Sequence, residues 1–175
     1  MVLVRPNWNV TYSMLRLGID GSLKIYTFYI PVERTKWEVT YSLFSQGYKY
    51  SNKCQLPEKC GNFGLCKSDV CVGCPTETGA TEWSSSCQPR TVSALACTNK
   101  AFKFNKLVGV DHFMSAFTQG ENVSESDCGS KCTSDCKCAG YFYHQAESKC
   151  WVAYDFKTLT RNNNSTHIGY IKVPK

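Results

Sequence analysis

The sequence has little of what catalysis requires. Its three histidines, His112, His144 and His167, are far apart along the chain, and none belongs to an HExxH zinc motif. The sequence also lacks a nucleophile motif, a phosphate-binding glycine loop and a kinase signature. We therefore expect a protein that is not an enzyme and that uses no cofactor.

Long apolar segments are missing as well. No stretch approaches the ~20 apolar residues that a helix needs to cross a bilayer, so we expect no membrane span in this chain. Residues 1–6 have neither the basic nor the apolar part of a signal peptide. We therefore expect Met1 to be an internal residue or the chain to be truncated.

Charge of one sign is not concentrated anywhere. The formal net charge is +6, and the densest basic set is Lys100, Lys103 and Lys106, with acidic residues interleaved elsewhere. Proteins that bind nucleic acid gather lysine and arginine on one face, so this distribution argues against a nucleic-acid partner. A mild positive charge fits weak, salt-sensitive contact with acidic polysaccharide.

Cysteine is absent from residues 1–53 and abundant afterwards. All twelve cysteines lie between Cys54 and Cys150, at a density typical of disulfide scaffolds in oxidising compartments. A zinc site would have to use Cys71 and Cys74, which lack a second pair of ligands at finger spacing, so we expect no metal. The chain also carries glycosylation sequons at Asn9, Asn122, Asn163 and Asn164. We therefore expect an extracellular location.

Alternating apolar residues predict β-structure in residues 1–53. Apolar positions alternate over 15–25 around an Asp20-Gly21 turn, which predicts a hairpin. A second alternating run predicts a strand with one buried and one solvent-facing side, and its apolar positions are Trp37, Val39, Tyr41 and Leu43. So few strands are marginal alone. We expect this segment to be the end of a larger β-domain.

Residues 54–90 and 91–175 differ in their local pattern. In the first, cysteines are separated by Gly, Asn, Pro and Ser, and no regular element longer than a few residues is expected. Six cysteines allow fifteen pairings, so spacing alone leaves the connectivity of this segment open. In the second, Ser124 can cap a helix over residues 125–134 that carries Cys128 and Cys132 on one face. Strand-like runs at 102–107, 141–143, 150–154 and 168–173 predict an antiparallel sheet crossed by that helix.

The later cysteines follow a spacing that resembles the PAN/apple domain of plant S-locus glycoproteins and S-type receptor kinases. The residues that carry the resemblance are Cys128, Cys132, Cys136 and Cys138, then Tyr141 and Tyr143, then Cys150-Trp151. The run from Cys60 to Cys66, CGNFGLC, resembles the EGF-like module that precedes that domain. The runs 109–114, 140–145 and 169–174 are most similar to the epidermis-specific secreted glycoproteins of plants.

This resemblance implies small disulfide-rich modules, mostly β. Residues 1–53 are similar to the C-terminal remnant of a lectin or S-locus glycoprotein β-domain, 54–90 to an EGF-like disulfide module, and 91–175 to a PAN/apple α+β domain. The implied disulfides are Cys54–Cys66, Cys60–Cys71, Cys74–Cys87, Cys97–Cys136, Cys128–Cys150 and Cys132–Cys138. Every cysteine is then paired.

The resemblance to bulb lectins raises the question of mannose binding. Those lectins hold mannose with a Gln-x-Asp-x-Asn-x-Val-x-Tyr pattern, and residues 18–26 match it only at Asp20 and Tyr26. Gly18, Ser22 and Lys24 replace the other three positions. Because two hydrogen-bonding side chains are lost, we expect no mannose site in this segment.

Rings are the best candidates for ligand contact, because they stack on sugars and anchor protein interfaces. The candidates are Tyr141, Tyr143, His144, Trp151 and Tyr154. From the resemblance we expect a non-enzymatic, secreted recognition glycoprotein that contacts protein or cell-wall carbohydrate through its apple and EGF-like modules. Two alternatives stay open, a structural cell-wall glycoprotein and an ectodomain fragment of an S-type receptor-like kinase.

Overall fold

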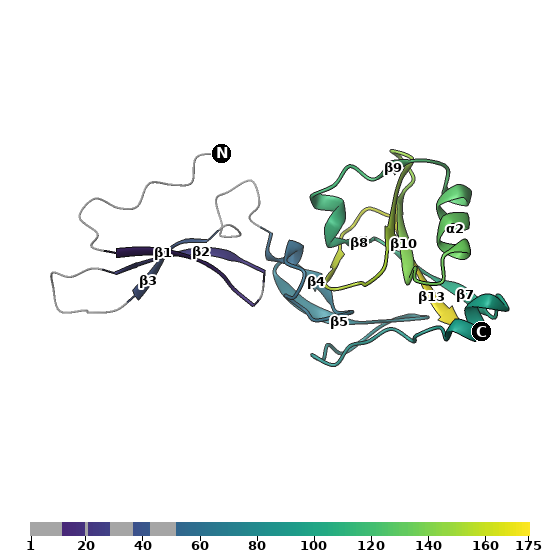
Figure 1. Ribbon diagram of the computed structural model, residues 1–175, viewed down its shortest axis with the longest axis horizontal. Helices are drawn as coiled ribbons and strands as arrows, with labels where there is room; N and C mark the ends of the chain where they lie inside the picture. The colour runs from purple at the N-terminus through teal and green to yellow at the C-terminus, as the bar shows by residue number, and fades with distance from the viewer. Residues whose placement is uncertain (1–11, 20, 29–36, 43–51) are drawn as a thin grey trace.

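The computed structural model describes residues 12–19, 21–28, 37–42 and 52–175. Its first sheet lies at one end of the molecule and has the strand order β1-β2-β3 (Figure 1). These antiparallel strands are β1 (Tyr12–Leu17), β2 (Leu23–Phe28) and β3 (Trp37–Ser42). The hairpin predicted over residues 15–25 is confirmed, while its turn residue Asp20 lies outside the described residues.

The burial predicted for this sheet is wrong. Trp37 and Val39 are 44% and 52% exposed, and Leu17 on the neighbouring hairpin is 69% exposed. Alternation places side chains on opposite faces of a strand, but a face is buried only where a second layer covers it. Within the described ranges, these strands contact chiefly one another. Leu43, the last apolar position of the pattern, lies outside the described residues.

A five-stranded antiparallel sheet follows, with the order β7-β13-β10-β11-β9. Its strands are β7 (Phe102–Val108), β9 (Glu121–Asn122), β10 (Gly140–His144), β11 (Lys149–Ala153) and β13 (His167–Pro174). Helix α2 (Glu125–Ser134) packs against β10 and β11 (Figure 1). The predicted sheet crossed by one helix is confirmed.

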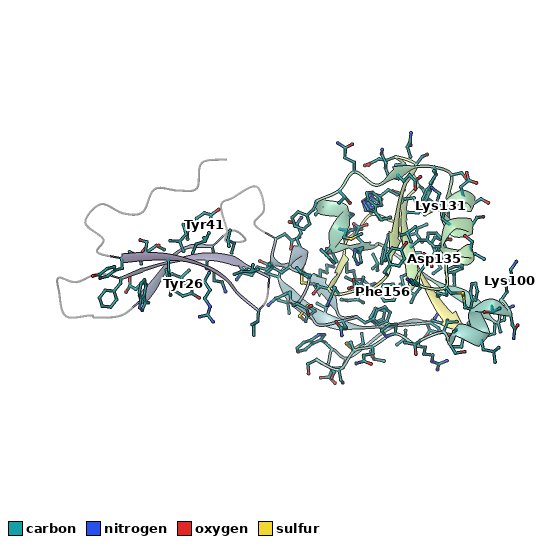
Figure 2. The ribbon with its side chains drawn as sticks, viewed as in Figure 1. Tyr26, Tyr41, Lys100, Lys131, Asp135 and Phe156 are labelled. Carbon is teal, nitrogen blue, oxygen red and sulfur yellow. A yellow bond between two sulfur atoms is a disulfide. The ribbon has the colours of Figure 1, made fainter. Side chains whose placement is uncertain are left out.

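Side chains form hydrogen bonds with backbone groups at both ends of α2. Ser124 Oγ accepts a hydrogen bond from the Asp127 backbone N–H at 3.1 Å, which is the predicted cap. At the other end, Lys172 Nζ on β13 donates to the carbonyl oxygens of Cys132 and Asp135 at 2.6 and 2.9 Å. A cation is favourable there because the helix dipole is negative at its C-terminus. Figure 2 shows Asp135 at this end of the helix.

A second five-stranded sheet has the order β6-β5-β4-β12-β8. Its strands are β4 (Leu65–Lys67), β5 (Val70–Thr76), β6 (Gly79–Thr81), β8 (Val110–His112) and β12 (Leu159–Arg161). Strand β12 pairs parallel with β4 and antiparallel with β8, so residues from both cysteine-rich segments share this sheet. The seven residues of β5 exceed the short elements expected between 54 and 90.

The remaining regular elements are short helices. Helix α1 (Ala94–Thr98) was not predicted from the sequence, and it is capped by Ser93, whose Oγ accepts from the Ala96 N–H at 3.1 Å. Two 3-10 helices cover Lys53–Gln55 and Phe113–Ala116. None of the helices in the described part of the chain combines the length and apolarity needed to cross a membrane.

The two five-stranded sheets enclose a common core. Phe63 and Leu65 from the first cysteine-rich segment pack in one cluster with Phe142 and Ile171 from the second. Phe156 lies between them, with its ring centroid 5.2 Å from that of Phe63 and 6.4 Å from that of Phe142 (Figure 2). Burying one such side chain stabilises a fold by about 1.5–3 kcal/mol.

Six disulfides lie within the two cysteine-rich segments that form this core. The six bonds are Cys54–Cys66, Cys60–Cys71, Cys74–Cys87, Cys97–Cys136, Cys128–Cys150 and Cys132–Cys138, the same pairs that the family resemblance implies. None joins the segment 54–90 to the segment 91–175, so the shared sheet and core hold those two segments together. A bond of this kind typically contributes about 2–4 kcal/mol by restricting the unfolded chain.

Candidate functional site

The ring residues proposed as ligand contacts lie in two kinds of environment. Tyr141, Tyr143 and His144 on β10 and Trp151 on β11 are all between 5% and 7% exposed. Tyr154, just after β11, is 61% exposed. All five residues of β10 are buried, so both faces of this strand are covered and alternation leaves no free row of rings.

The two tyrosines of β10 pack beneath α2. The Tyr141 ring stacks on that of Tyr170 with centroids 4.5 Å apart, and burial raises the pKa of Tyr141 to about 12. Tyr170 Oη donates to the Glu125 carboxylate in the first turn of α2, and this hydrogen bond lowers the pKa of Glu125. Tyr143 Oη donates to the Val123 carbonyl at 3.1 Å. These hydroxyls hold the helix on the sheet.

His144 belongs to a cluster at the other end of β10. Its Nε2 lies 2.7 Å from Asp111 Oδ1, and His167 Nδ1 lies 2.9 Å from Asp111 Oδ2. The three residues come from different strands, Asp111 from β8, His144 from the end of β10 and His167 from the start of β13. His144 and His167 face each other across the β10–β13 ladder. Asn162 Nδ2 also donates to Asp111.

A turn at Gly109 allows this cluster to assemble. Gly109 has a φ of +69°, its N–H donates to the His167 carbonyl at 2.8 Å, and its carbonyl accepts from Asn162 N–H at 2.9 Å. A Cβ at this position would lie 2.8 Å from the Asn162 carbonyl oxygen. Glycine therefore lets the chain before Asp111 approach the turn that carries Asn162 and His167.

The arrangement of the two imidazoles decides what the cluster can hold. Asp111, His144 and His167 offer a ligand atom each, all within 4.8 Å of one another, which is a combination that metals use. However, the two rings are stacked, with centroids 3.5 Å apart and planes 16° apart. A metal bound by imidazole lies in the ring plane at about 2.0–2.1 Å from nitrogen. Planes this close to parallel do not meet at that distance, so the geometry fits a hydrogen-bonded cluster.

Trp151 packs at a tilt against the His144 ring and borders an open cavity. Its ring centroid lies 4.4 Å from that of His144, and its Nε1 donates to Thr118 Oγ1 at 2.9 Å. Gly120 crosses the indole closely, because a Cβ there would lie 2.6 Å from Trp151 Cε2. The cavity, of about 360 Å³, is called the histidine cavity below and is lined by Ser115, Thr118, Gln119, His144, Glu147, Lys149, Trp151 and His167.

His112 has a separate, structural environment. It follows Asp111 on β8 and therefore points to the opposite face of the strand. His112 Nε2 donates to the Asp155 carbonyl at 3.0 Å, and Nδ1 accepts from the Met114 N–H at 3.3 Å. Burial lowers the pKa of His112, which keeps the ring neutral in these two bonds.

A second cavity and the glycosylation sequons lie away from the histidine cavity. The second cavity, of about 210 Å³, lies between the two cysteine-rich segments and is lined in part by Arg90, Glu77 and Asn105. Asn122, on β9, and Asn163 and Asn164, before β13, are exposed, as glycan attachment requires. Asn9 lies outside the described residues.

The sequence did not reveal how the cluster assembles. His144 and His167 are distant along the chain, yet the structure brings their rings together. Asp111 was not singled out as a site residue at all. The signal that could have found the pair was the alignment of the predicted strands 141–143 and 168–173 as antiparallel neighbours, with one histidine at facing ends.

Comparison with known proteins identifies relatives over nearly the whole chain. EP1-like glycoprotein 3 of Arabidopsis thaliana is 40% identical over 173 residues, covering 98% of this chain and 39% of the relative. The epidermis-specific secreted glycoprotein EP1 of Daucus carota is 46% identical over 121 residues, 62% of this chain and 31% of the relative. A G-type lectin S-receptor-like serine/threonine-protein kinase of A. thaliana is 28% identical over 138 residues, 70% of this chain and 16% of the relative. No protein-family model matches the chain.

Proposed function

The chain belongs, over 98% of its own length, to the EP1-like glycoproteins, and from this premise we propose that it is a secreted, non-enzymatic recognition glycoprotein. The chain spans 39% of the length of EP1-like glycoprotein 3, so the proposal concerns what this part of such a protein contributes. The proposed contribution is contact with protein or cell-wall carbohydrate.

The cysteines support an extracellular place of action. All twelve are paired, and a thiol-reducing compartment would not maintain six disulfides. The relative from D. carota is named as a secreted glycoprotein, which agrees with this interpretation. Pairing also leaves no cysteine thiolate to act as a nucleophile, and His112 is occupied by two backbone contacts.

We assign the module boundaries as part of the same proposal. Residues 54–90 act as the EGF-like module and 91–175 as the PAN/apple module, and 1–53 are the remnant of a lectin-type β-domain. The disulfides support this division, because three lie within each of the two later segments. The shared sheet supports a fixed orientation of the two modules, since β12 pairs with β4.

The single observation that carries the proposal is the histidine cavity. It lies at one end of a sheet that a disulfide joins to α2, through Cys150, one residue before Trp151, and Cys128. A concave surface with a few fixed polar groups beside a ring is the usual form of a small-ligand site. His144 and Trp151 are held by hydrogen bonds to Asp111 and Thr118, which reduces the entropy cost of binding.

One alternative is supported by a different observation. The density of disulfides would equally suit a structural cell-wall glycoprotein, in which the modules are resistant spacers. A recognition glycoprotein binds a partner saturably, whereas a structural glycoprotein with spacer modules does not.

Binding by the full, oxidised chain tests the proposal. We would immobilise it and measure retention of cell-wall polysaccharides, mannosylated glycans and extracellular proteins from plant tissue at low and physiological salt, with the reduced chain as control. Saturable retention that survives physiological salt and disappears on reduction is the expected result. Absence of such retention for every class would overturn recognition and favour the structural alternative.

A further inference from the structure

We propose that the histidine cavity binds a neutral, hydroxyl-rich sugar residue and that Asp111 is the positioning residue that prepares its two histidines. This inference rests on the proposed recognition function and names the ligand class and the site. Its support comes from the hydrogen bonds that fix the imidazoles, from the groups that line the cavity and from the balance of charge around it.

Asp111 determines which ring nitrogens carry hydrogen. An ionised carboxylate only accepts hydrogen bonds, so His144 donates from Nε2 to Oδ1 and His167 donates from Nδ1 to Oδ2. In a neutral imidazole the other nitrogen is then an acceptor. His144 Nδ1 and His167 Nε2 make no hydrogen bond with any described residue, and both rings line the cavity. One carboxylate thus prepares two acceptors for hydroxyl groups.

The rest of the lining complements these acceptors. Lys149 supplies a donor, Glu147 an acceptor and Gln119 both, so the cavity can satisfy hydroxyls in either direction. The Trp151 ring adds an apolar wall held in place by its bond to Thr118. A sugar residue presents hydroxyls around an apolar ring face. The hydroxyls fit the polar groups of the lining, and the ring face fits the Trp151 side chain. A volume of about 360 Å³ falls within the ordinary range of small-ligand sites.

Charge favours a neutral ligand over an anionic one. Lys149 is the one ammonium group in the lining, and Glu147 lies in the same lining while Asp111 lies behind the histidines. An acidic sugar would bring its carboxylate toward these two carboxylates. A metal ion is disfavoured by the stacked imidazoles, whose planes do not converge on one point at bonding distance.

Two kinds of variant test the site without removing its core. Glu147 is exposed and His167 is partly exposed, so Glu147→Ala and His167→Ala should fold, which the melting temperature and the disulfide mass map would verify. Tyr154→Ala is the matched control, because Tyr154, although a ring candidate from the sequence, is an exposed ring that the structure places outside the cavity lining. Asp111→Asn tests positioning, because a carboxamide replaces one acceptor oxygen by an NH2 group, which would face the Asn162 Nδ2 donor or a ring N–H instead of accepting from it.

The experiment is a titration of the full, oxidised chain, produced without glycans, by neutral methyl glycosides of mannose, glucose and galactose, followed by imidazole ¹⁵N NMR. Methyl galacturonide and Zn²⁺ are the comparison probes. We expect a neutral glycoside to shift the His144 and His167 signals, and Glu147→Ala and His167→Ala each to weaken binding about fivefold or more. Tyr154→Ala should bind as the wild type does. Asp111→Asn should change the tautomer pattern of the ¹⁵N signals and weaken binding without lowering the count of disulfides.

The other outcomes separate this inference from the proposed function. Neutral sugar that binds without moving these histidine signals, or equally well to Glu147→Ala and His167→Ala, would overturn the site while supporting carbohydrate recognition. Response to Zn²⁺ or galacturonide alone would overturn the ligand class. Absence of any glycoside binding, with a protein partner retained in the immobilised assay, would overturn this inference and leave the proposed function standing.

Discussion

The sheet of β1–β3 and the unit formed by residues 52–175 use apolar side chains in opposite ways. Leu17 in the first is 69% exposed, whereas Leu159 in the second is 0% exposed. Both regions have alternating strands, but only the second has two sheets that share one buried core, with three disulfides inside each of its cysteine-rich segments. The comparison teaches that alternation fixes which side chains share a face, while a second layer decides whether that face is buried.

Matched leucine substitutions should show the largest difference between the two regions. Leu159→Ala leaves a cavity in the shared core and should lower the free energy of unfolding by about 2–5 kcal/mol. Leu17→Ala should change it by less than about 0.5 kcal/mol, because little apolar surface leaves the interior. Denaturant unfolding of the two oxidised variants measures both values. Equal losses would show that β1–β3 packs into a core of its own.

Removing one disulfide should come next in size. The double variant Cys128→Ala/Cys150→Ala opens a loop whose ends are 22 residues apart and should lower the free energy of unfolding by about 3 kcal/mol. The double variant Cys132→Ala/Cys138→Ala, with a separation of 6, should lose less because the shorter loop restricts the unfolded chain less. Thermal unfolding compares the two, and the reverse order would contradict the loop-length explanation.

Removing the N-terminal cap of α2 should lower the free energy of unfolding by less than the Leu159→Ala substitution or the loss of the Cys128–Cys150 disulfide. Ser124→Ala removes the acceptor for the Asp127 N–H and should cost about 1 kcal/mol. Ser124→Asp keeps an acceptor at that position and serves as the control. If both variants unfold at the wild-type denaturant concentration, the hydrogen bond at this end does not stabilise the helix.

The smallest effect expected concerns pH and His112. Burial lowers its folded-state pKa below the ordinary value of 6.5, so the unfolded chain binds the proton more readily. The stability supplied by the neutral ring is therefore present above pH 6.5 and is lost as pH falls from there toward the lowered folded-state pKa.

The His112→Asn variant isolates this effect. It has no titrating ring at this position, so the stability advantage of the wild type should narrow between pH 7 and pH 5 in denaturant unfolding. Because the other histidines are present in both proteins, their contributions cancel in the difference. A gap that stays constant or widens as pH falls would contradict the assignment of a neutral, buried His112.

Much of the fold could be predicted from local sequence. Ser124 and the spacing of Cys128 and Cys132 predicted α2 and its buried face, and both cysteines are 0% exposed. Aromatic and β-branched runs predicted the strands of the larger sheet. The partnership of β12 with β4 could not be predicted, because parallel pairing of segments nearly a hundred residues apart leaves no local signal.

The candidate site was less accessible to sequence reasoning. His144 and Trp151 were predicted as contacts and do line the cavity, whereas Tyr141 and Tyr143 are buried under α2. All four rings look alike in sequence, because the pattern of a strand does not show which element covers each face of the sheet. His167 joins the site through the register of β10 and β13. Asp111 joins it from β8 of the other sheet, through the turn at Gly109, so both depend on the assembled fold.

Amide hydrogen exchange of the full, oxidised chain tests most directly whether residues 52–175 form one cooperative, disulfide-bonded unit that supports the histidine cavity. The account predicts that β4, β10 and β12 exchange with a common, high free energy of opening, while β1 exchanges much faster. Reduction should abolish the slow class throughout 52–175. If β4 instead exchanged independently of β10, or β1 were protected as strongly as β10, the claim that residues 52–175 form one cooperative unit would be contradicted.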